Sequence, residues 1–436
     1  MRPERYPTRS PLGVLGPMAD HAVEFLFRAE ALDAPVVRSW LGPFPQWFVF
    51  DAELGRDVLQ RLDEDFNRPP YLRHLIGAAT GATLFTTVGD VWNQRRRMLQ
   101  PEFHRKRVQT MTGQITDVIN AEMSIWPTDH DFDLQAAISS LALRIAGRTM
   151  FGIDLADDDR SELPPAFATV SGWLTDRFYN PKALPAAIPT AKNRAFHEAR
   201  STLRHFVGAL VRERRARPSD THDVLQILLD ARLDTGESLS DDDIVAESLG
   251  FLFAGHETTA SAITWAVYEL ARHPDVADRI REEDDENDDT LRNVVRETLR
   301  LHPPAWGIPR TATRSTLLGP YRVRRGVGVI VSTYTINRSP RYWDHPDTFD
   351  PDRYLPGRDP QRPAFLPLSF GAGPRMCIGQ AFAELEAQLV LTQLLDRYDL
   401  DQPDPKPPAF FPQFSLRMID GLALTLRQRR TKHGAE

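Results

Sequence analysis

The spacing of hydrophobic residues along the chain predicts a mainly helical protein. The longest helical pattern follows Ser240, which forms a capping box with Asp243, and it ends at His273-Pro274. A second helix is predicted over 380–398. The apolar positions that support the two helices are Ile244, Leu249, Leu252, Phe253, Ile263 and Val267 in the first and Phe382, Leu385, Leu389 and Leu395 in the second.

Short strands and loops interrupt the helical pattern. Apolar residues predict strands near 47–50 and over 321–332, where alternation is accompanied by turn glycines. Residues 399–414 are rich in proline and phenylalanine, which favours an ordered loop leading into a final hairpin. Seven acids among residues 282–289 indicate a solvated loop between helices.

Charge and the N-terminal segment narrow the class of protein. The 436 residues carry a net charge of −7, which gives no general attraction to nucleic acid. The N-terminal stretch 1–32 contains many charged residues. It has neither the run of roughly 20 apolar residues that a membrane span needs nor the hydrophobic core of a secretory signal peptide. We therefore expect a cytoplasmic protein without a membrane anchor.

Cys377 is the only cysteine, and it lies in a loop, 370–379, with three glycines and one proline. A lone cysteine forms no internal disulfide, and zinc sites built on cysteine gather several ligands. A single cysteine can serve as the one axial thiolate ligand of haem iron. The alternative is that Cys377 is only a small buried residue in a glycine-rich turn. The glycines would let the backbone approach a flat macrocycle, Arg375 could bind an acidic group on its rim, and the following helix N-terminus would favour thiolate.

The whole segment, F-G-x-G-x-R-x-C-x-G, resembles the haem-binding signature of the cytochrome P-450 monooxygenases. Three further motifs extend the resemblance from about residue 85 to the C-terminus. It implies a cytochrome P-450 fold, mainly α with small β-sheets, as a triangular prism around a buried haem b. It also implies one domain over 1–436, a monomer similar to the bacterial members, Cys377 as the metal ligand, and Phe370 and Arg375 as cofactor-binding residues.

The second motif lies inside the long predicted helix. The segment 254–259, Ala-Gly-His-Glu-Thr-Thr, has poor helix propensity, which favours a functional bend or an inserted hydroxyl. It resembles the oxygen-activating helix of the family. The resemblance implies that Glu257 and Thr258 are catalytic and deliver protons, whereas we expect Thr259 to be a supporting hydroxyl and His256 a solvent-facing imidazole.

The third motif is a charge cluster. Glu297 and Arg300 are three residues apart on one predicted helix face, a spacing that is common and weak by itself. The segment around Arg353 resembles the family segment whose arginine completes a buried Glu-Arg-Arg cluster. The resemblance therefore implies a structural role for the three residues, and the loss of one would leave buried charge uncompensated.

The fourth motif places Trp92 and Arg96 four residues apart on one helix face. It resembles the Trp-x-x-x-Arg motif that binds a haem propionate in one branch of the family, and Arg310 matches the position of another propionate-binding arginine. Arg96, Arg310 and Arg375 would then form the cation set for two propionates. The neighbouring basic residues are expected to face outward: Arg95, Arg105, Lys106 and Arg107.

Two classes of function remain open. The first is a monooxygenase that inserts one oxygen atom from O2 into a lipophilic molecule such as a terpenoid, fatty acid, steroid or polyketide. The second is a haem-thiolate peroxygenase, isomerase or gas-binding protein without external electrons; the Glu257-Thr258 pair favours the first. By family position the expected walls of the substrate pocket are Phe251, Ala254, Trp306, Ile308, Phe411 and Phe414.

A monooxygenase needs two electrons, and the chain suggests an external source. The resemblance leaves little length for a flavin domain, and a ferredoxin cluster would need about four cysteines. We therefore expect a separate ferredoxin or flavodoxin with its NAD(P)H-dependent reductase. By resemblance, one basic segment borders the cysteine side of haem, where it could attract an acidic redox partner. Its positive charges are Arg95, Arg97, Arg105, Lys106 and Arg107.

Overall fold

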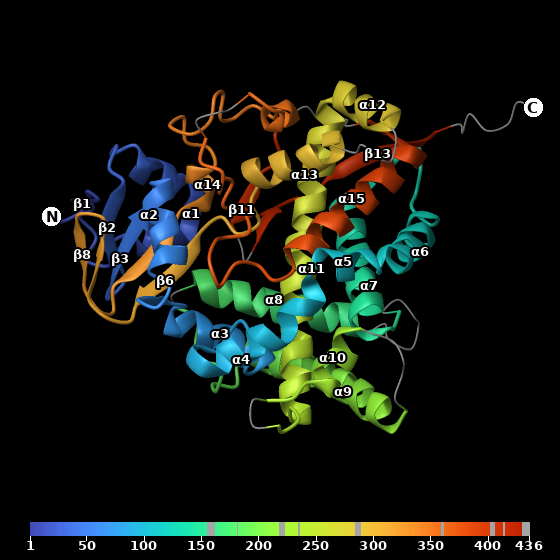
Figure 1. Ribbon diagram of the computed structural model, residues 1–436, viewed down its shortest axis with the longest axis horizontal. Helices are drawn as coiled ribbons and strands as arrows, with labels where there is room; N and C mark the ends of the chain where they lie inside the picture. The colour runs from blue at the N-terminus through green and yellow to red at the C-terminus, as the bar shows by residue number, and fades with distance from the viewer. Residues whose placement is uncertain are drawn as a thin grey trace, which may run out of the picture.

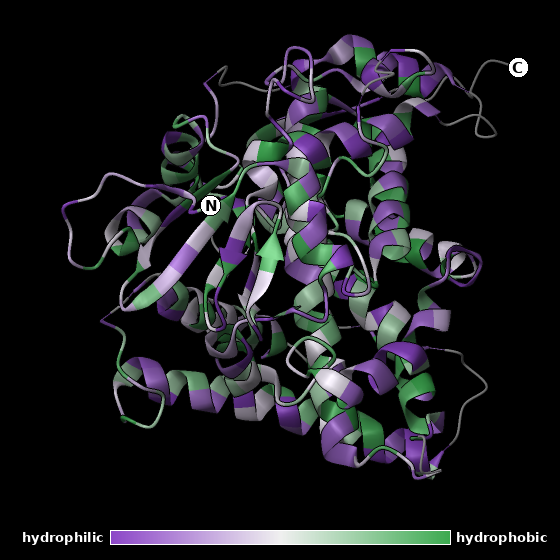
Figure 2. Cartoon of the chain, turned by 60° about the vertical axis from the view of Figure 1, so that its left-hand side comes forward, coloured by the Kyte–Doolittle hydropathy of each residue, from purple (hydrophilic) through white to green (hydrophobic). Residues whose placement is uncertain are grey.

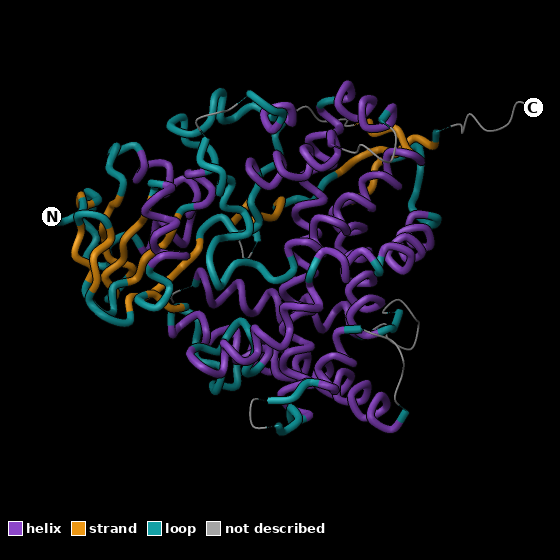
Figure 3. Tube along the Cα trace, viewed as in Figure 1, coloured by secondary structure: helices purple, strands orange, loops and turns teal. Residues whose placement is uncertain are grey.

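The computed structural model describes residues 1–154, 162–180, 182–217, 223–233, 236–283, 289–358, 362–401, 406–412 and 415–429. Helices predominate in these ranges, and most strands gather at one end of the molecule (Figure 1; Figure 3). The predicted fold class, mainly α with small β-sheets, is confirmed. Within the described ranges, no helix has both the length and the apolar character needed to cross a membrane.

The helices are α1 Leu15–Glu30, α2 Ala52–Arg56, α3 Pro70–Thr80, α4 Gly89–Leu99, α5 Arg105–Gln109, α6 Thr112–Met123, α7 Leu134–Phe151, α8 Leu163–Tyr179, α9 Ala191–Ala216, α10 Val224–Asp230, α11 Asp241–Arg272, α12 Pro274–Glu282, α13 Asp289–Leu301, α14 Thr333–Ile336 and α15 Gln380–Arg397. The strands are β1 Glu4–Arg5, β2 Val36–Leu41, β3 Phe44–Val49, β4 Phe66–Asn67, β5 Asp131–Asp133, β6 Ile308–Ala312, β7 Thr316–Leu318, β8 Tyr321–Val323, β9 Gly328–Val331, β10 Tyr398–Asp401, β11 Phe410–Pro412, β12 Leu416–Met418 and β13 Ala423–Gln428.

The largest sheet combines the N-terminal strands with strands from the second half of the chain, in the order β1-β2-β3-β9-β6-β4. Strands β2 and β3 form an antiparallel hairpin, and β3 lies parallel to β9. Strand β6 then pairs antiparallel with β9, with Arg310 opposite Val329. This arrangement carries Arg310 on an inner strand of the sheet. Smaller sheets pair β7 with β8, β11 with β12, and β10 with β13 and β5.

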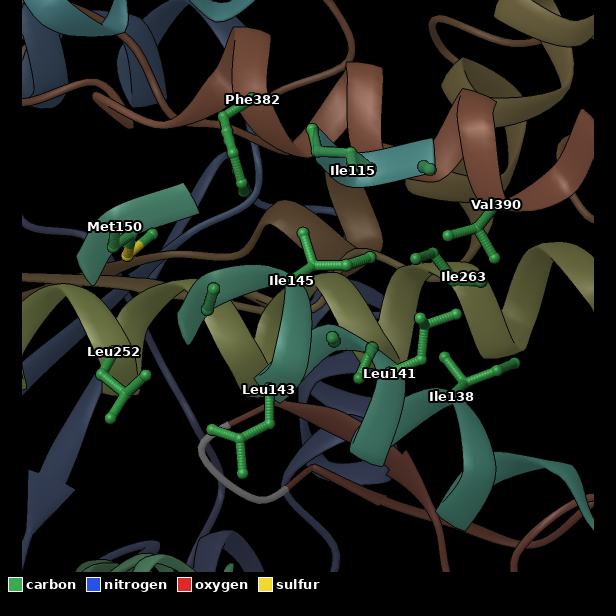
Figure 4. Close-up of a cluster of buried hydrophobic side chains, with 14 of the residues drawn as sticks. Ile115, Ile138, Leu141, Leu143, Ile145, Met150, Leu252, Ile263, Phe382 and Val390 are labelled. Atoms are coloured by element: carbon green, nitrogen blue, oxygen red, sulfur yellow. The ribbon is translucent and has the colours of Figure 1, made fainter. Parts of the chain in front are cut away.

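Helix α11 runs through the helical part of the molecule and packs against α7, α9, α13 and α15 (Figure 1). Most helices carry both hydrophobic and hydrophilic segments (Figure 2), as expected for one buried and one solvated face. Each fully buried aliphatic side chain stabilises this packing by about 1.5–3 kcal/mol. Figure 4 shows side chains that fill the core: Ile115, Ile138, Leu141, Leu143, Ile145, Met150, Leu252, Ile263, Phe382 and Val390.

The long predicted helix is confirmed as α11. Ser240 is its N-cap, with its hydroxyl accepting from the Asp243 N–H at 3.1 Å, and His273 is its C-cap. The helix predicted over 380–398 is α15, and the strand predicted near 47–50 lies at the end of β3. The stretch 321–332 is not one strand, because the chain turns at Gly326, with a φ of +86°, between β8 and β9.

The C-terminal loop and the acidic run lie partly outside the described residues. A hairpin is present, but it begins earlier than predicted, because β11 lies within the segment 399–414 that was expected to be a loop. Strand β11 pairs antiparallel with β12, with Phe410 opposite Met418 and Pro412 opposite Leu416. Of the acidic run, Glu282 ends α12 and Asp289 begins α13, and residues 284–288 are outside the described ranges.

Candidate active site

Cys377 lies in a tight loop that leads into α15. Its backbone N–H donates to the Phe370 carbonyl at 3.0 Å, and the Met376 N–H donates to the Gly373 carbonyl at 3.0 Å. Gly373 has a φ of +73°, and a β-carbon there would lie 2.3 Å from the Leu59 carbonyl oxygen. Only glycine fits this turn, which holds the Cys377 backbone just before the N-terminus of α15.

The side chain of Cys377 opens onto a pocket of about 340 Å³. Segments from both halves of the chain line this pocket, which therefore exists only in the folded protein. The sulfur has no possible disulfide partner, because Cys377 is the only cysteine, and it stands on the wall of a space that a ligand could enter. The other lining residues are Arg96, Gln100, Phe103, His104, Arg105, Met376, Ile378, Gln380, Ala381 and Glu384.

Opposing effects act on the Cys377 thiol. Burial by surrounding protein atoms raises the pKa of the thiol, whereas the Gly379 N–H and the charges of Arg96 and Arg68 lower it. The Gly379 N–H belongs to the N-terminus of α15 and acts in the direction that we expected, but burial is the largest effect on the pKa of the thiol. A coordinated metal cation would favour the thiolate, because a metal-bound thiol is deprotonated.

Four buried or half-buried arginines, Arg68, Arg96, Arg310 and Arg375, form the arginine cluster near Cys377. Burial, followed by the charges of Arg310, Arg375 and Arg96, lowers the pKa of Arg68 well below its usual range. Burial and Arg375 lower the pKa of Arg310 to about 10. Guanidinium groups repel one another in this way only when they lie close together, so the cluster is a concentrated patch of positive charge.

Several N–H groups of the arginine cluster have no acceptor among the described residues. They are Nε of Arg310 and Nε and Nη1 of Arg375, all buried. Asp63 lies 3.6 Å from Arg375, but one carboxylate does not balance four guanidinium groups. The cluster therefore fits a ligand that brings two carboxylates into the site, as the propionates of haem would do.

Helix α4 places Trp92 and Arg96 at this cluster. Trp92 is buried, and the Arg375 guanidinium lies over its ring, with Cζ 4.2 Å from the ring centre. Arg96 donates from Nε to Gln100 Oε1 at 3.0 Å. Burial lowers the pKa of Arg96, and the Cys377 thiolate raises it, which shows that Arg96 lies near the sulfur.

Arg68 is the member of the cluster that the sequence motifs did not reveal. It follows β4, and its Nη1 donates to the carbonyl of Leu84 at 3.0 Å and to that of Phe85. A single arginine with backbone partners has no characteristic spacing. Strand pairing was the signal that could have revealed Arg68. Asn67 of β4 lies opposite Thr311 of β6, so the next residue along the chain, Arg68, comes close to Arg310.

Thr258 lies in the middle of α11 and leaves the helix continuous. Its hydroxyl donates to the Ala254 carbonyl at 2.7 Å, one turn earlier, and α11 runs unbroken from Asp241 to Arg272. Of the two expected features, the structure shows the inserted hydroxyl, because the Thr258 side chain shares the Ala254 carbonyl with the helix backbone. The neighbouring Ala254 is exposed, so the helix presents little bulk beside Thr258.

Glu257 is held from outside its own helix. Its Oε1 accepts a hydrogen bond from the hydroxyl of Ser415 at 3.0 Å. Burial raises the pKa of Glu257, while Ser415 and the charge of Arg417 lower it. A carboxyl in such surroundings keeps its proton to higher pH than an exposed glutamate, as suits a proton-transfer group.

The expectation that His256 faces solvent is wrong. Its Nε2 lies 2.9 Å from the hydroxyl oxygen and 2.9 Å from the carbonyl oxygen of Ser139 on α7. Its ring meets Phe167 edge-on at 4.9 Å, and burial lowers its pKa to about 4. His256 is therefore a neutral group that links α11 to α7, and Thr259 is buried, as expected of a supporting hydroxyl.

Glu297, Arg300 and Arg353 meet in a fully buried cluster. Arg300 donates from Nε and Nη2 to the two carboxylate oxygens of Glu297 at 2.8 Å each, and Arg353 donates from Nε to Oε1 at 2.8 Å. The exposed fractions of the three side chains are 0%, 0% and 4%. Other N–H groups of both arginines donate to the carbonyls of Asn337, Asp344, Pro346 and Thr348.

The basic segment that starts on α4 is only partly at the surface. Arg95 was expected to face outward and is buried instead, donating to Asp243 Oδ1 at 2.6 Å and to Glu247 Oε1 at 2.5 Å, both on α11. Arg107 is half-buried and pairs with Glu102 at 3.0 Å. The exposed basic side chains of the segment are Arg97, Arg105 and Lys106.

The residues expected to line a substrate pocket have different surroundings. Ala254 is exposed, and Ile308 and Phe411 are half-buried, so these three can border an open space. Phe414 lies outside the described residues.

Phe251 and Trp306 are core residues. Phe251 is buried and stacks on Phe103 with ring centres 5.2 Å apart. Trp306 is buried in the cluster that joins α1 to β3 and β9. Their burial is compatible with an internal pocket, so their place among its walls stays a prediction.

Comparisons with known proteins agree with this geometry. Residues 7–425 match the cytochrome P-450 family model. The cyclooctat-9-en-7-ol 5-monooxygenase of Streptomyces melanosporofaciens is 31% identical over 378 residues, covering 83% of this chain and 81% of the relative. Leukotriene-B4 omega-hydroxylase 3 of Mus musculus is 30% identical over 427 residues, covering 88% of this chain and 81% of the relative.

Solved structures share the fold. The haem domain of cytochrome P450DA superposes with a TM-score of 0.89 at 24% identity, covering 99% of this chain and 98% of that one. Retinoic-acid-bound cyanobacterial CYP120A1 gives a TM-score of 0.86 at 24% identity, covering 98% of this chain and 99% of that one.

The fold and the match over nearly the whole chain define the class of protein as a cytochrome P-450 oxidoreductase. The chain belongs to the cytochrome P-450 family. Enzymes of this family bind haem through a cysteine thiolate and use O2 together with a redox partner.

Proposed function

We propose that the chain is a haem-thiolate monooxygenase that inserts one oxygen atom from O2 into a lipophilic small molecule, with Cys377 as the axial ligand of haem b. The observation that carries this proposal is the pocket-facing Cys377 sulfur beside the four guanidinium groups of the arginine cluster. Bound haem would supply the oxygen-activating chemistry. The arginine cluster would hold its propionates, and Trp92 and Phe370 would border it.

Glu257 and Thr258 support reaction with O2 rather than rearrangement of a peroxide. Reductive cleavage of O2 consumes protons, so the site needs a group that carries protons and a hydroxyl that passes them on. Glu257 has a raised pKa, and Thr258 follows it directly on the continuous helix α11. We propose that Glu257 accepts protons from the solvent side and that the Thr258 hydroxyl donates them at the reacting oxygen.

The ligand assignment makes a spectroscopic prediction. Reduced holoprotein under carbon monoxide is expected to show the red-shifted Soret band of thiolate-ligated haem, and Cys377→Ser is expected to abolish it, because a serine hydroxyl does not replace the thiolate. Thr258→Ala, which leaves the sulfur untouched, is the control and should keep the band. Persistence of the band in Cys377→Ser would contradict the assignment.

We propose a terpenoid or a fatty-acid-like molecule as the substrate. The names of two relatives give cyclooctat-9-en-7-ol and leukotriene B4, both largely hydrocarbon molecules. Ala254, Ile308 and Phe411 would present apolar groups to such a ligand. A screen of lipophilic compounds by the spectral shift that follows displacement of iron-bound water would identify binders.

We further propose that a separate ferredoxin or flavodoxin, reduced by an NAD(P)H-dependent reductase, binds beside the Cys377 pocket. Arg105 lines that pocket, and Lys106 and Arg97 add exposed positive charge next to it. An acidic carrier would be steered to such a surface, and its association would weaken with salt.

The docking proposal predicts a kinetic effect. Arg105→Glu with Lys106→Glu should slow the first reduction of the holoprotein by a ferredoxin at low salt, without changing turnover driven by added hydrogen peroxide. The matched control is Arg322→Glu with Arg324→Glu, which reverses two exposed charges at and beside β8, far from α5 (Figure 1). Equal slowing in both double variants, or no slowing in the first, would contradict docking at α5.

A further inference from the structure

The C-terminal hairpin of β11 and β12 is bound to one face of α11. Ser415 donates to Glu257 Oε1 at 3.0 Å, and the hydroxyl of Ser261 and the indole N–H of Trp265 donate to the Leu416 carbonyl at 2.6 and 2.8 Å. The three positions on α11 are each four residues apart, so they form one row along the helix. Ser415 and Leu416, which are consecutive in the hairpin, thus form hydrogen bonds to three successive turns of α11, beginning with the turn of Glu257.

The hairpin is also fixed on its other sides. The Gln135 side chain on α7 donates to the Met418 carbonyl and accepts from the Met418 N–H, both at 3.2 Å. The Leu416 N–H donates to the Pro304 carbonyl at 3.2 Å. Ser415 itself is 0% exposed. Its hydroxyl is therefore a buried donor next to a strand that is hydrogen-bonded to α7 and α11, and it donates to a carboxylate oxygen.

The hairpin supplies both groups that favour the ionised form of Glu257. These are the Ser415 hydroxyl and the charge of Arg417, two residues further along β12, and they act against the effect of burial. From its own helix, the neighbouring His256 is a neutral imidazole whose pKa Arg417 also helps to lower. Arg417 is therefore the charged residue whose field lowers the pKa of Glu257.

We propose that Ser415 is a positioning residue for proton delivery, because it holds the Glu257 carboxyl in the orientation from which a proton passes to Thr258. The proposal rests on the monooxygenase function proposed above. It makes the proton supply a property of two segments 158 residues apart, the middle of α11 and the C-terminal hairpin. A hydroxyl that only filled space would not change the ionisation of Glu257.

The test is a pH titration of Glu257 by infrared spectroscopy in the holoprotein. The band that disappears in Glu257→Gln identifies the carboxyl. In Ser415→Ala the midpoint of its ionisation should rise by about one pH unit, because a hydrogen bond to the charged form is lost. Arg417→Gln, at an exposed position, should give a smaller rise.

Ser261→Ala is the matched control. It removes a hydroxyl that binds the same hairpin to the same helix, and it should leave the midpoint of Glu257 unchanged. If Ser415→Ala does not fold, Ser415→Cys keeps the volume with a much weaker donor and serves the same comparison. An unchanged midpoint in folded Ser415→Ala or Ser415→Cys, or an equal rise in Ser261→Ala, would overturn the proposal.

A second measurement separates this proposal from the proposed function. The pH profile of product formed per electron should move upward with the infrared midpoint in Ser415→Ala and stay in place in Ser261→Ala. An infrared shift without any oxygenated product from the parent protein would disprove the monooxygenase function and leave the Ser415 contact established. Product formation whose pH profile does not follow the shifted midpoint would overturn the positioning role.

Discussion

Replacement of Glu297 by alanine is expected to cause a severe loss in the yield of folded, haem-loaded protein. The substitution would leave the guanidinium groups of Arg300 and Arg353 buried without their carboxylate. Breaking a buried ion pair in this way costs about 3–5 kcal/mol, and native proteins are stable by only about 5–15 kcal/mol. The measurement is thermal unfolding of whatever soluble protein is recovered, together with its haem content.

The same helix offers a matched control. Arg292 and Asp289 on α13 have the same spacing as Arg300 and Glu297, and they form an ion pair of 2.7 Å at the surface. Asp289→Ala should change stability by no more than about 1 kcal/mol, because solvent screens exposed pairs. Arg353→Ala should behave like Glu297→Ala. Well-folded holoprotein from Glu297→Ala would show that the buried cluster contributes little.

The contrast between these two pairs explains what the sequence could predict. Spacing alone identified Glu297 and Arg300 as neighbours, but Asp289 and Arg292 have the same spacing and lie at the surface. Arg353, which lies 56 residues beyond Glu297, was found only through resemblance to a family segment. Helical periodicity predicts which residues share a face, and it does not predict which face other segments cover.

The wrong expectations have the same physical origin. Arg95 lies in a run of arginines typical of a surface, and it is buried because Glu247, 152 residues away, supplies a carboxylate. His256 is buried because the carbonyl oxygen of Ser139, 117 residues earlier, can accept a hydrogen bond from its Nε2. Local pattern was sufficient for α11 and α15, whose apolar stripes are contained in their own segments. It was insufficient wherever one residue depended on a partner from a distant element.

Thr258→Ala is expected to uncouple electron transfer from oxygenation. Electrons from the redox partner should go to hydrogen peroxide or water instead of product, because the hydroxyl that passes the proton is gone. Loss of one positioned proton-transfer group slows its step by about 10²- to 10⁴-fold. Haem content, the carbon monoxide spectrum and substrate binding should change little, since the hydrogen bond that the Thr258 hydroxyl makes among the described residues is to its own helix, at the Ala254 carbonyl.

The control for this prediction lies on the same helix. The Thr264 hydroxyl donates to the Ala260 carbonyl at 2.8 Å, which repeats the geometry of Thr258 less than two turns further on. Thr264→Ala removes the same kind of hydrogen bond without touching the residue after Glu257, so product per electron should remain at the parental value. Simultaneous measurement of NAD(P)H consumed, peroxide formed and product formed distinguishes the cases. Equal product per electron in Thr258→Ala and the parent would contradict the proton-delivery role, and an equal loss in both variants would assign the effect to the helix instead.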